Sequence, residues 1–332
     1  MDETLDYATI YKTLSAGVKK GFFKKTSPND SGGDFACVSK NLGGQECPEL
    51  AGLFLLGKAK CEAGSRNPLS EASTLFTAAE YFVQAEDKLC CVNAVNYGEY
   101  LDCATMCLLR SAKMYEVGEL FTLAGNVYIY IVDILMRHNK FGETIPYLRR
   151  AIQILSKDIL CSLQLLHKLV CCQLRIHDWP GALNTCLQIQ AMIYDPGRRL
   201  SLVTDPPNPD FHIDNGKNSM VFYSNYWVKA EVIRVFLVLL TAPSQKLSDK
   251  PDGGYSLDRY SFSTDIPADE YCWPLNPDLF MHLQSFILAF RAKHVVEVEA
   301  ISSVLQSFLD VDQRELMVVL INDLTNPPGS GL

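Results

Sequence analysis

The chain has 332 residues, of which 48% are hydrophobic, and its formal net charge is −8. This charge argues against a nucleic-acid partner, because a surface that binds nucleic acid needs a basic stripe to neutralise phosphates. The N-terminus is acidic and lacks the apolar core of a cleavable signal, and the apolar runs 121–136 and 232–240 are too short to span a bilayer. We therefore expect a cytoplasmic protein without a transmembrane segment.

Hydrophobic periodicity predicts a series of helices in the first half of the chain. Apolar residues recur at helical spacing near the N-terminus: Tyr7, Ile10, Leu14, Val18 and Phe22. The lysines of this helix are either solvated or in contact with an acidic partner or a membrane. Segment 26–33 has the composition of a loop. Further helices are predicted at 35–42, 48–63, 70–88, 99–116 and 119–137, the third of them with Ser70 as its N-cap.

Two segments 38 positions apart share one pattern, Asp133–Leu155 and Cys171–Ile193. Each has an apolar helix end, a polar break, a large aromatic residue (Phe141 or Trp179) that we expect to pack in the core, and a second amphipathic helix. A helical hairpin of this size cannot bury its apolar face alone, so it must stack on neighbours. The sequence therefore predicts an all-α fold, a tetratricopeptide-like helical-hairpin solenoid of the kind that binds other proteins.

The second helix of each repeat contains an early proline. Pro146 and Pro180 must lie in the first turn, because a proline deeper in a helix costs about 3 kcal/mol. We therefore predict that Thr144 and Asp178 cap these helices.

Proline and glycine interrupt the second half of the chain. Residues 195–218 are predicted to form a disordered, proline-rich loop, and 219–240 a strongly apolar helix. A second broken loop, 241–274, contains one short helical turn. We divide the chain accordingly into an N-terminal helical array (1–194), the loop, and C-terminal helices (219–332) that complete the same solenoid.

The C-terminal region is acidic, since residues 251–332 contain twelve Asp and Glu residues against four Lys and Arg residues. We expect it to face a basic partner surface. Three closing helices are predicted: 277–290, 295–309 and one that starts at Asp312 with Glu315 as its capping-box partner. Asp310, Asp312 and Glu315 are the residues that we predict to contact the partner.

Signs of catalysis are weak. The twelve cysteines are expected to be reduced core thiols, because no secretion signal is visible. Cys103 and Cys107 supply at most half of a zinc site. A cysteine nucleophile stays open as an alternative, which a thiol of depressed pKa would reveal. The sequence predicts no enzyme, no metal and no cofactor.

Six segments spread along the chain carry a family resemblance: 45–63, 78–87, 97–104, 257–262, 279–290 and 328–332. In their order and spacing they resemble the forty-kilodalton huntingtin-associated protein family. The resemblance implies an α-solenoid that binds huntingtin, a very large HEAT-repeat protein, in a one-to-one complex. It would lie in a cleft between the N- and C-terminal HEAT domains of huntingtin and stabilise their arrangement.

The same resemblance implies a link to early endosomes through a Rab-type GTPase, with cytoplasmic, endosomal and nuclear locations. We add Tyr260 and Phe262, within the 257–262 segment, to the predicted partner interface. A second similarity stays open: segments 78–87 and 144–155 resemble soluble NSF attachment proteins. In that alternative the chain is a vesicle-fusion adaptor that binds SNARE bundles.

Overall fold

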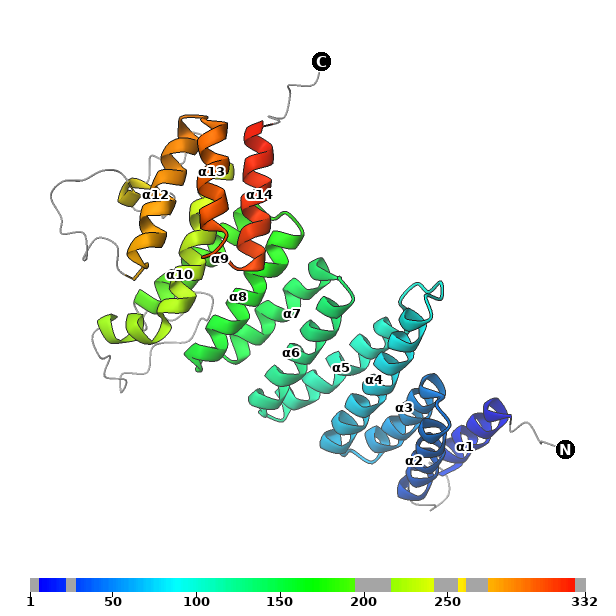
Figure 1. Ribbon diagram of the computed structural model, residues 1–332. Helices are drawn as coiled ribbons and strands as arrows, with labels where there is room; N and C mark the ends of the chain where they lie inside the picture. Colours follow the sequence, from blue (N-terminus) through cyan, green and yellow to red (C-terminus); the bar gives the residue numbers. More distant parts are fainter. Residues whose placement is uncertain (1–5, 22–27, 195–215, 242–255, 261–273, 326–332) are drawn as a thin grey trace. The chain divides into compact units, whose positions relative to one another are not determined.

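The computed structural model describes residues 6–21, 28–194, 216–241, 256–260 and 274–325. Within these ranges every regular element is a helix, which confirms the predicted all-α solenoid class (Figure 1). In the same ranges no helix is long and apolar enough to cross a bilayer. The helices form two compact units, Met1–Lys140 and Phe141–Leu332. Most of the loop 195–218 lies outside the described residues. The predicted division of the chain at this loop, into 1–194 and 219–332, therefore stays a prediction.

In the first unit each helix packs on the next one along the chain. Its helices are α1 (Tyr7–Gly21), α2 (Pro28–Gly44), α3 (Pro48–Gly64), α4 (Pro68–Cys91), α5 (Glu99–Val117) and α6 (Phe121–Arg137). The apolar stripe predicted for α1 is confirmed where its side chains are described: Tyr7, Ile10 and Leu14 pack on the core between α2 and α3. Val18 and Phe22 have no described side chains.

Glycine allows close packing in this N-terminal core. Tyr11 of α1 packs edge-on against Phe35 and Phe54, with ring centroids 5.6 and 5.4 Å away. A Cβ on Gly57 would lie 2.4 Å from the Phe35 ring. Position 57 must therefore be glycine for α2 and α3 to approach this closely, since even one added methyl group overpacks a tight core.

Non-glycine residues with positive φ end many of the helices. Asn139 (φ 59°) and His177 (φ 59°) occupy equivalent places in the two repeats, 38 positions apart. In each, the next amide closes a bond back over the last helical turn, from Lys140 N to the Leu135 oxygen (2.9 Å) and from Asp178 N to the Gln173 oxygen (2.9 Å). These bonds confirm that the two copies of the predicted repeat share the same turn between their helices. The first copy spans the boundary between the two units.

Several predicted helix starts were wrong, three of them in α2, α4 and α7. The predicted loop 26–33 is helical from Pro28, which suits a first helical position. Helix α4 starts at Pro68 because the Asn67 side chain accepts a hydrogen bond from the Ser70 amide, while the Ser70 hydroxyl donates to Glu62.

The third error concerns α7 (Phe141–Ile154), which begins ahead of the predicted cap Thr144 and holds Pro146 in its interior. The carbonyl that Pro146 leaves without a helical partner belongs to Gly142, which is exposed, so water can hydrate it. The equivalent prediction for Asp178 is confirmed, since its carboxylate accepts from the Gly181 amide at 3.0 Å.

The second unit is built around one buried helix. Its elements are α7, α8 (Ile159–Arg175), α9 (Trp179–Tyr194), α10 (Gly216–Thr241), the 3₁₀ turn η2 (Asp258–Tyr260), α12 (Pro277–Arg291), α13 (Val295–Leu305) and α14 (Val311–Thr325). Helix α10 packs against α8, α9 and α14. Every residue from Ala230 to Leu239 is buried. This explains why α10 is apolar all round rather than along one stripe.

Candidate partner-binding surfaces

The acidic residues predicted to contact a partner have basic neighbours within the second unit. Asp312 and Glu315 both pair with the Arg175 guanidinium of α8, at 3.0 and 2.7 Å. Asp310 lies 3.7 Å from Lys229 of α10. These pairs are partly exposed and worth about 1 kcal/mol or less each, so a basic partner surface can compete for the carboxylates. Their role in a partner interface stays a prediction.

Asp310 also caps the start of α14, two residues ahead of the predicted capping box. Its carboxylate accepts from the Gln313 amide at 3.0 Å, and the Gln313 side chain accepts from the Asp310 amide at 3.0 Å. The predicted pair, Asp312 with Glu315, was wrong because both pairs fit the same sequence pattern. Burial decides between them: Gln313 is 4% exposed, and its side-chain amide also donates to the Lys229 carbonyl.

Tyr260 belongs to the interior of the second unit. Its side chain is 1% exposed, and its hydroxyl donates to Glu231 at 3.0 Å. Arg234 donates two hydrogen bonds to the same carboxylate, at 2.8 and 2.7 Å, and one to the Ser256 carbonyl. Tyr260 therefore fixes segment 256–260 to α10, and its predicted contact with a partner stays a prediction. Phe262 lies outside the described residues.

This buried network sets the charges of its members. Burial alone would raise the pKa of Glu231, but the hydrogen bonds from Arg234, Gln190 and Tyr260 outweigh it and lower the pKa. Burial and the neighbouring carboxylate raise the pKa of the Tyr260 hydroxyl well above its usual value, so it remains a donor. The network is saturated and holds the fold rather than offering a site.

An apolar groove lies on the surface of the first unit. It holds about 580 Å³ where the start of α4 meets the end of α5, and its lining residues are Pro68, Leu69, Arg110, Lys113, Met114, Val117, Gly118 and Leu120. Leu69 is 50% exposed and Val117 86%. Two basic residues flank these side chains. An exposed apolar surface with a charged rim is typical of a protein-binding site.

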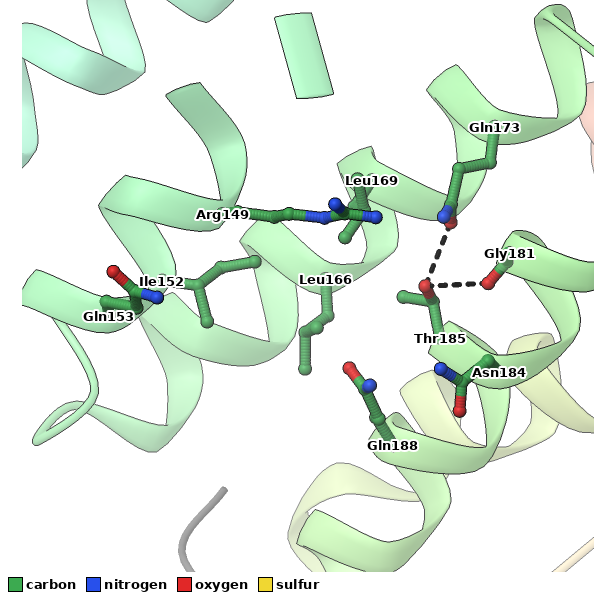
Figure 2. Close-up of a pocket in the computed structure, with 10 residues that line it drawn as sticks. All are labelled: Arg149, Ile152, Gln153, Leu166, Leu169, Gln173, Gly181, Asn184, Thr185 and Gln188. Atoms are coloured by element: carbon green, nitrogen blue, oxygen red, sulfur yellow. Dashed lines mark hydrogen bonds between the residues drawn. The ribbon is translucent and has the colours of Figure 1, made fainter. Parts of the chain in front are cut away.

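A polar groove lies on the second unit, where α7, α8 and α9 meet (Figure 2). It holds about 240 Å³, and its apolar lining consists of Ile152, Leu166 and Leu169, all buried. Arg149 reaches from α7 towards the middle of the groove, and the amides of Asn184 and Gln188 lie on α9 (Figure 2). Amide side chains both donate and accept, so such a groove can hold the main chain of an extended segment.

The wall of this polar groove depends on the start of α9. The Thr185 hydroxyl lies 2.9 Å from the Gln173 side-chain oxygen and 3.0 Å from the Gly181 carbonyl, which fixes Gln173 against α9. A Cβ on Gly181 would lie 2.0 Å from the Asp178 carboxylate. Glycine at 181 therefore lets the Asp178 cap and the Gln173 amide sit side by side.

The described cysteines with shifted pKa values do not resemble activated nucleophiles. Burial raises the pKa of Cys107 to about 12 and that of Cys172 to about 11. Burial likewise raises the pKa of Cys103, which lies four residues before Cys107 on α5. An attacking thiolate needs the opposite shift.

Sequence reasoning missed both grooves. Their residues lie on several helices, and each taken alone has the polar or apolar character of an ordinary helix surface. The one available signal was the repeat itself, because stacked hairpins create grooves between alternate helices.

The described helices define an all-α solenoid protein whose surface includes the apolar and polar grooves, with no strand among the described residues. No protein-family model matches the chain. Over 369 aligned residues it is 25% identical to the 40-kDa huntingtin-associated proteins of mouse and of rat. The alignments cover 99% of this chain and 96% of each relative. The predicted family resemblance is thereby confirmed along the whole chain.

Proposed function

We propose that this chain is a non-catalytic subunit that binds huntingtin. The supporting observation is the similarity over nearly the whole length to two proteins named for huntingtin association. The proposed role is to hold the HEAT-repeat protein in one conformation, in a one-to-one complex. Early-endosome association through a Rab-type GTPase, and cytoplasmic and nuclear locations, extend the proposal on the strength of the family resemblance.

The apolar groove of the first unit is the surface that we assign to the main contact. Burial of apolar surface supplies about 25 cal/mol per Å², and the groove exposes Leu69, Val117 and Leu120 without a covering element among the described residues. A rigid helical frame also loses little conformational freedom on binding. Arg110 and Lys113 at its rim would add selectivity rather than affinity.

Co-expression tests the proposal. The chain is produced with full-length huntingtin of its own organism, and size-exclusion chromatography with mass determination follows. We expect one peak with the mass of a one-to-one complex. Two separate peaks, together with binding to assembled SNARE bundles, would instead support the vesicle-fusion adaptor.

Surface variants test the groove. Val117→Lys places a charge at an 86% exposed position, so the fold should be unaffected while binding weakens about 30-fold or more, as at an interface hot spot. Val95→Lys is the matched control, because Val95 is 90% exposed and lies outside the groove. Equal affinity of both variants for huntingtin would exclude this groove as the main contact.

A further inference from the structure

Three potential metal ligands from distant parts of the sequence meet in the first unit. Glu86 and Cys90 lie four residues apart on α4 and so share a helix face, and His138 caps the end of α6. Their ligand atoms all lie within 4.8 Å of one another. Cys90 Sγ lies 3.9 Å from His138 Nδ1.

Glu86 provides an independent reason to look for a ligand here. Its side chain is 3% exposed, and its Oε2 has no hydrogen-bond partner. Leaving a buried carboxylate oxygen without a partner costs more than about 1–3 kcal/mol, because the group loses its hydration and gains nothing in return. A cation bound by the three side chains would give this buried carboxylate a counter-charge and a ligand bond.

His138 has its second nitrogen beside another carboxylate. The ring is 13% exposed, and its Nε2 lies 3.3 Å from Asp87 Oδ1, at an angle that makes no hydrogen bond in the present rotamer. A histidine that binds a metal through one nitrogen commonly donates the other N–H to a carboxylate. Here Nδ1 faces the cysteine and Nε2 faces the carboxylate, which is the arrangement that such a site needs.

We propose that Glu86, Cys90 and His138 bind a zinc ion, with Asp87 as the residue that orients His138. A thiolate, an imidazole and a carboxylate together favour Zn²⁺ over Mg²⁺ or Ca²⁺, which prefer oxygen ligands. Zinc in a tetrahedral site keeps a sulfur and a nitrogen ligand about 3.5 Å apart. The distance of 3.9 Å between Cys90 Sγ and His138 Nδ1 would therefore shorten only slightly when zinc binds.

The fourth position of this zinc site opens towards solvent, since Cys90 is exposed. Water completes the tetrahedron there. On binding, the Cys90 thiol releases its proton to solvent and the thiolate coordinates the ion. The bound ion ties the end of α6 to α4, which are separated in the chain by the whole of α5. Its role is to stabilise the first unit. This assignment reverses the expectation from sequence, which predicted no metal.

Cobalt is the probe that reports on this site directly. The untagged full chain is reduced, stripped with a chelator and titrated with Co²⁺, and thiolate-to-cobalt absorption and the visible bands of tetrahedral cobalt are recorded. We expect one equivalent to bind and Zn²⁺ to displace it. Zinc should also raise the thermal unfolding temperature of the chain. Absence of thiolate-to-cobalt absorption in the native chain would overturn the proposal.

Matched variants locate the site. Cys90→Ser and His138→Gln should abolish the thiolate-to-cobalt absorption or weaken cobalt binding more than 100-fold, and Asp87→Asn should weaken it about 10- to 100-fold. Cys91→Ser, which changes the exposed neighbouring thiol, should leave it unchanged. Circular dichroism of the stripped proteins checks that each variant is folded. If Cys91→Ser loses cobalt as Cys90→Ser does, or if neither does, binding is adventitious and the proposal fails.

Discussion

The interiors of the two units are stabilised in different ways. In the first unit, fully buried alanines such as Ala51, Ala78 and Ala104 let neighbouring helices approach closely, and each helix packs on the next. In the second unit, the Glu231–Arg234 ion pair is buried on both sides and joins α9, α10 and segment 256–260. The first unit therefore depends on shape, and the second also depends on a charge network that one substitution can leave unpaired.

Tryptophan fluorescence can separate the two units. All three tryptophans, Trp179, Trp227 and Trp273, fall within the second unit. Fluorescence therefore follows unfolding of the second unit, while circular dichroism follows the helices of both. The two signals therefore allow the unfolding of the second unit to be measured separately from that of the whole chain.

The largest effect is expected from Arg234→Met. It leaves the Glu231 carboxylate buried without its main partner, and breaking such a pair costs about 3–5 kcal/mol. The fluorescence-detected urea transition should shift to lower concentration by that free energy. The double variant Glu231→Leu with Arg234→Met should recover most of the loss, because no buried charge remains. A single variant as stable as the native chain would show that the network contributes little.

A smaller effect is expected from Gly57→Ala in the first unit. The new methyl group would meet the Phe35 ring at 2.4 Å, and overpacking of this kind costs about 1–3 kcal/mol. The loss should appear in circular dichroism and not in fluorescence.

Two controls accompany Gly57→Ala. Gly33→Ala, with nothing within 4 Å of the added Cβ, should stabilise α2 by about 0.5–1 kcal/mol. Adding Phe35→Leu to Gly57→Ala should relieve part of the clash. If fluorescence shifts as much as circular dichroism, the units unfold together and the comparison between them does not hold.

Sequence periodicity predicted most helices, because an amphipathic or apolar stripe depends on local spacing alone. It failed at the helix starts near Ser70, Thr144 and Asp312, where several polar residues can cap and burial selects one. It also gave no sign of the hydrogen bond between Tyr260 and Glu231, which are 29 residues apart. The Glu86, Cys90 and His138 group shows the same limit, since α5 lies between its members. Local patterns specify elements, whereas pairings across elements need the fold.

The smallest effect is expected at the helix ends. Glu119 (φ 58°) in the first unit and Lys293 (φ 58°) in the second adopt the left-handed conformation, in which a Cβ costs about 1–2 kcal/mol. Glycine removes this cost but adds about 0.5–1 kcal/mol of backbone entropy to the unfolded chain, so each substitution should stabilise by about 1 kcal/mol or less. Glu119→Gly should shift only the circular dichroism transition, whereas Lys293→Gly should also shift fluorescence.

Gly98 provides the opposite test, because its φ is 80° and a Cβ would meet only Lys140 at an ordinary 3.5 Å. Gly98→Ala should therefore destabilise the first unit through backbone strain alone, by about 1 kcal/mol. A stabilising Gly98→Ala, or a destabilising Glu119→Gly, would mean that the helix ends are not strained as their φ angles indicate. The test depends on the signs of the two stability changes rather than on their sizes. A general loss of helix stability would make both Gly98→Ala and Glu119→Gly destabilising.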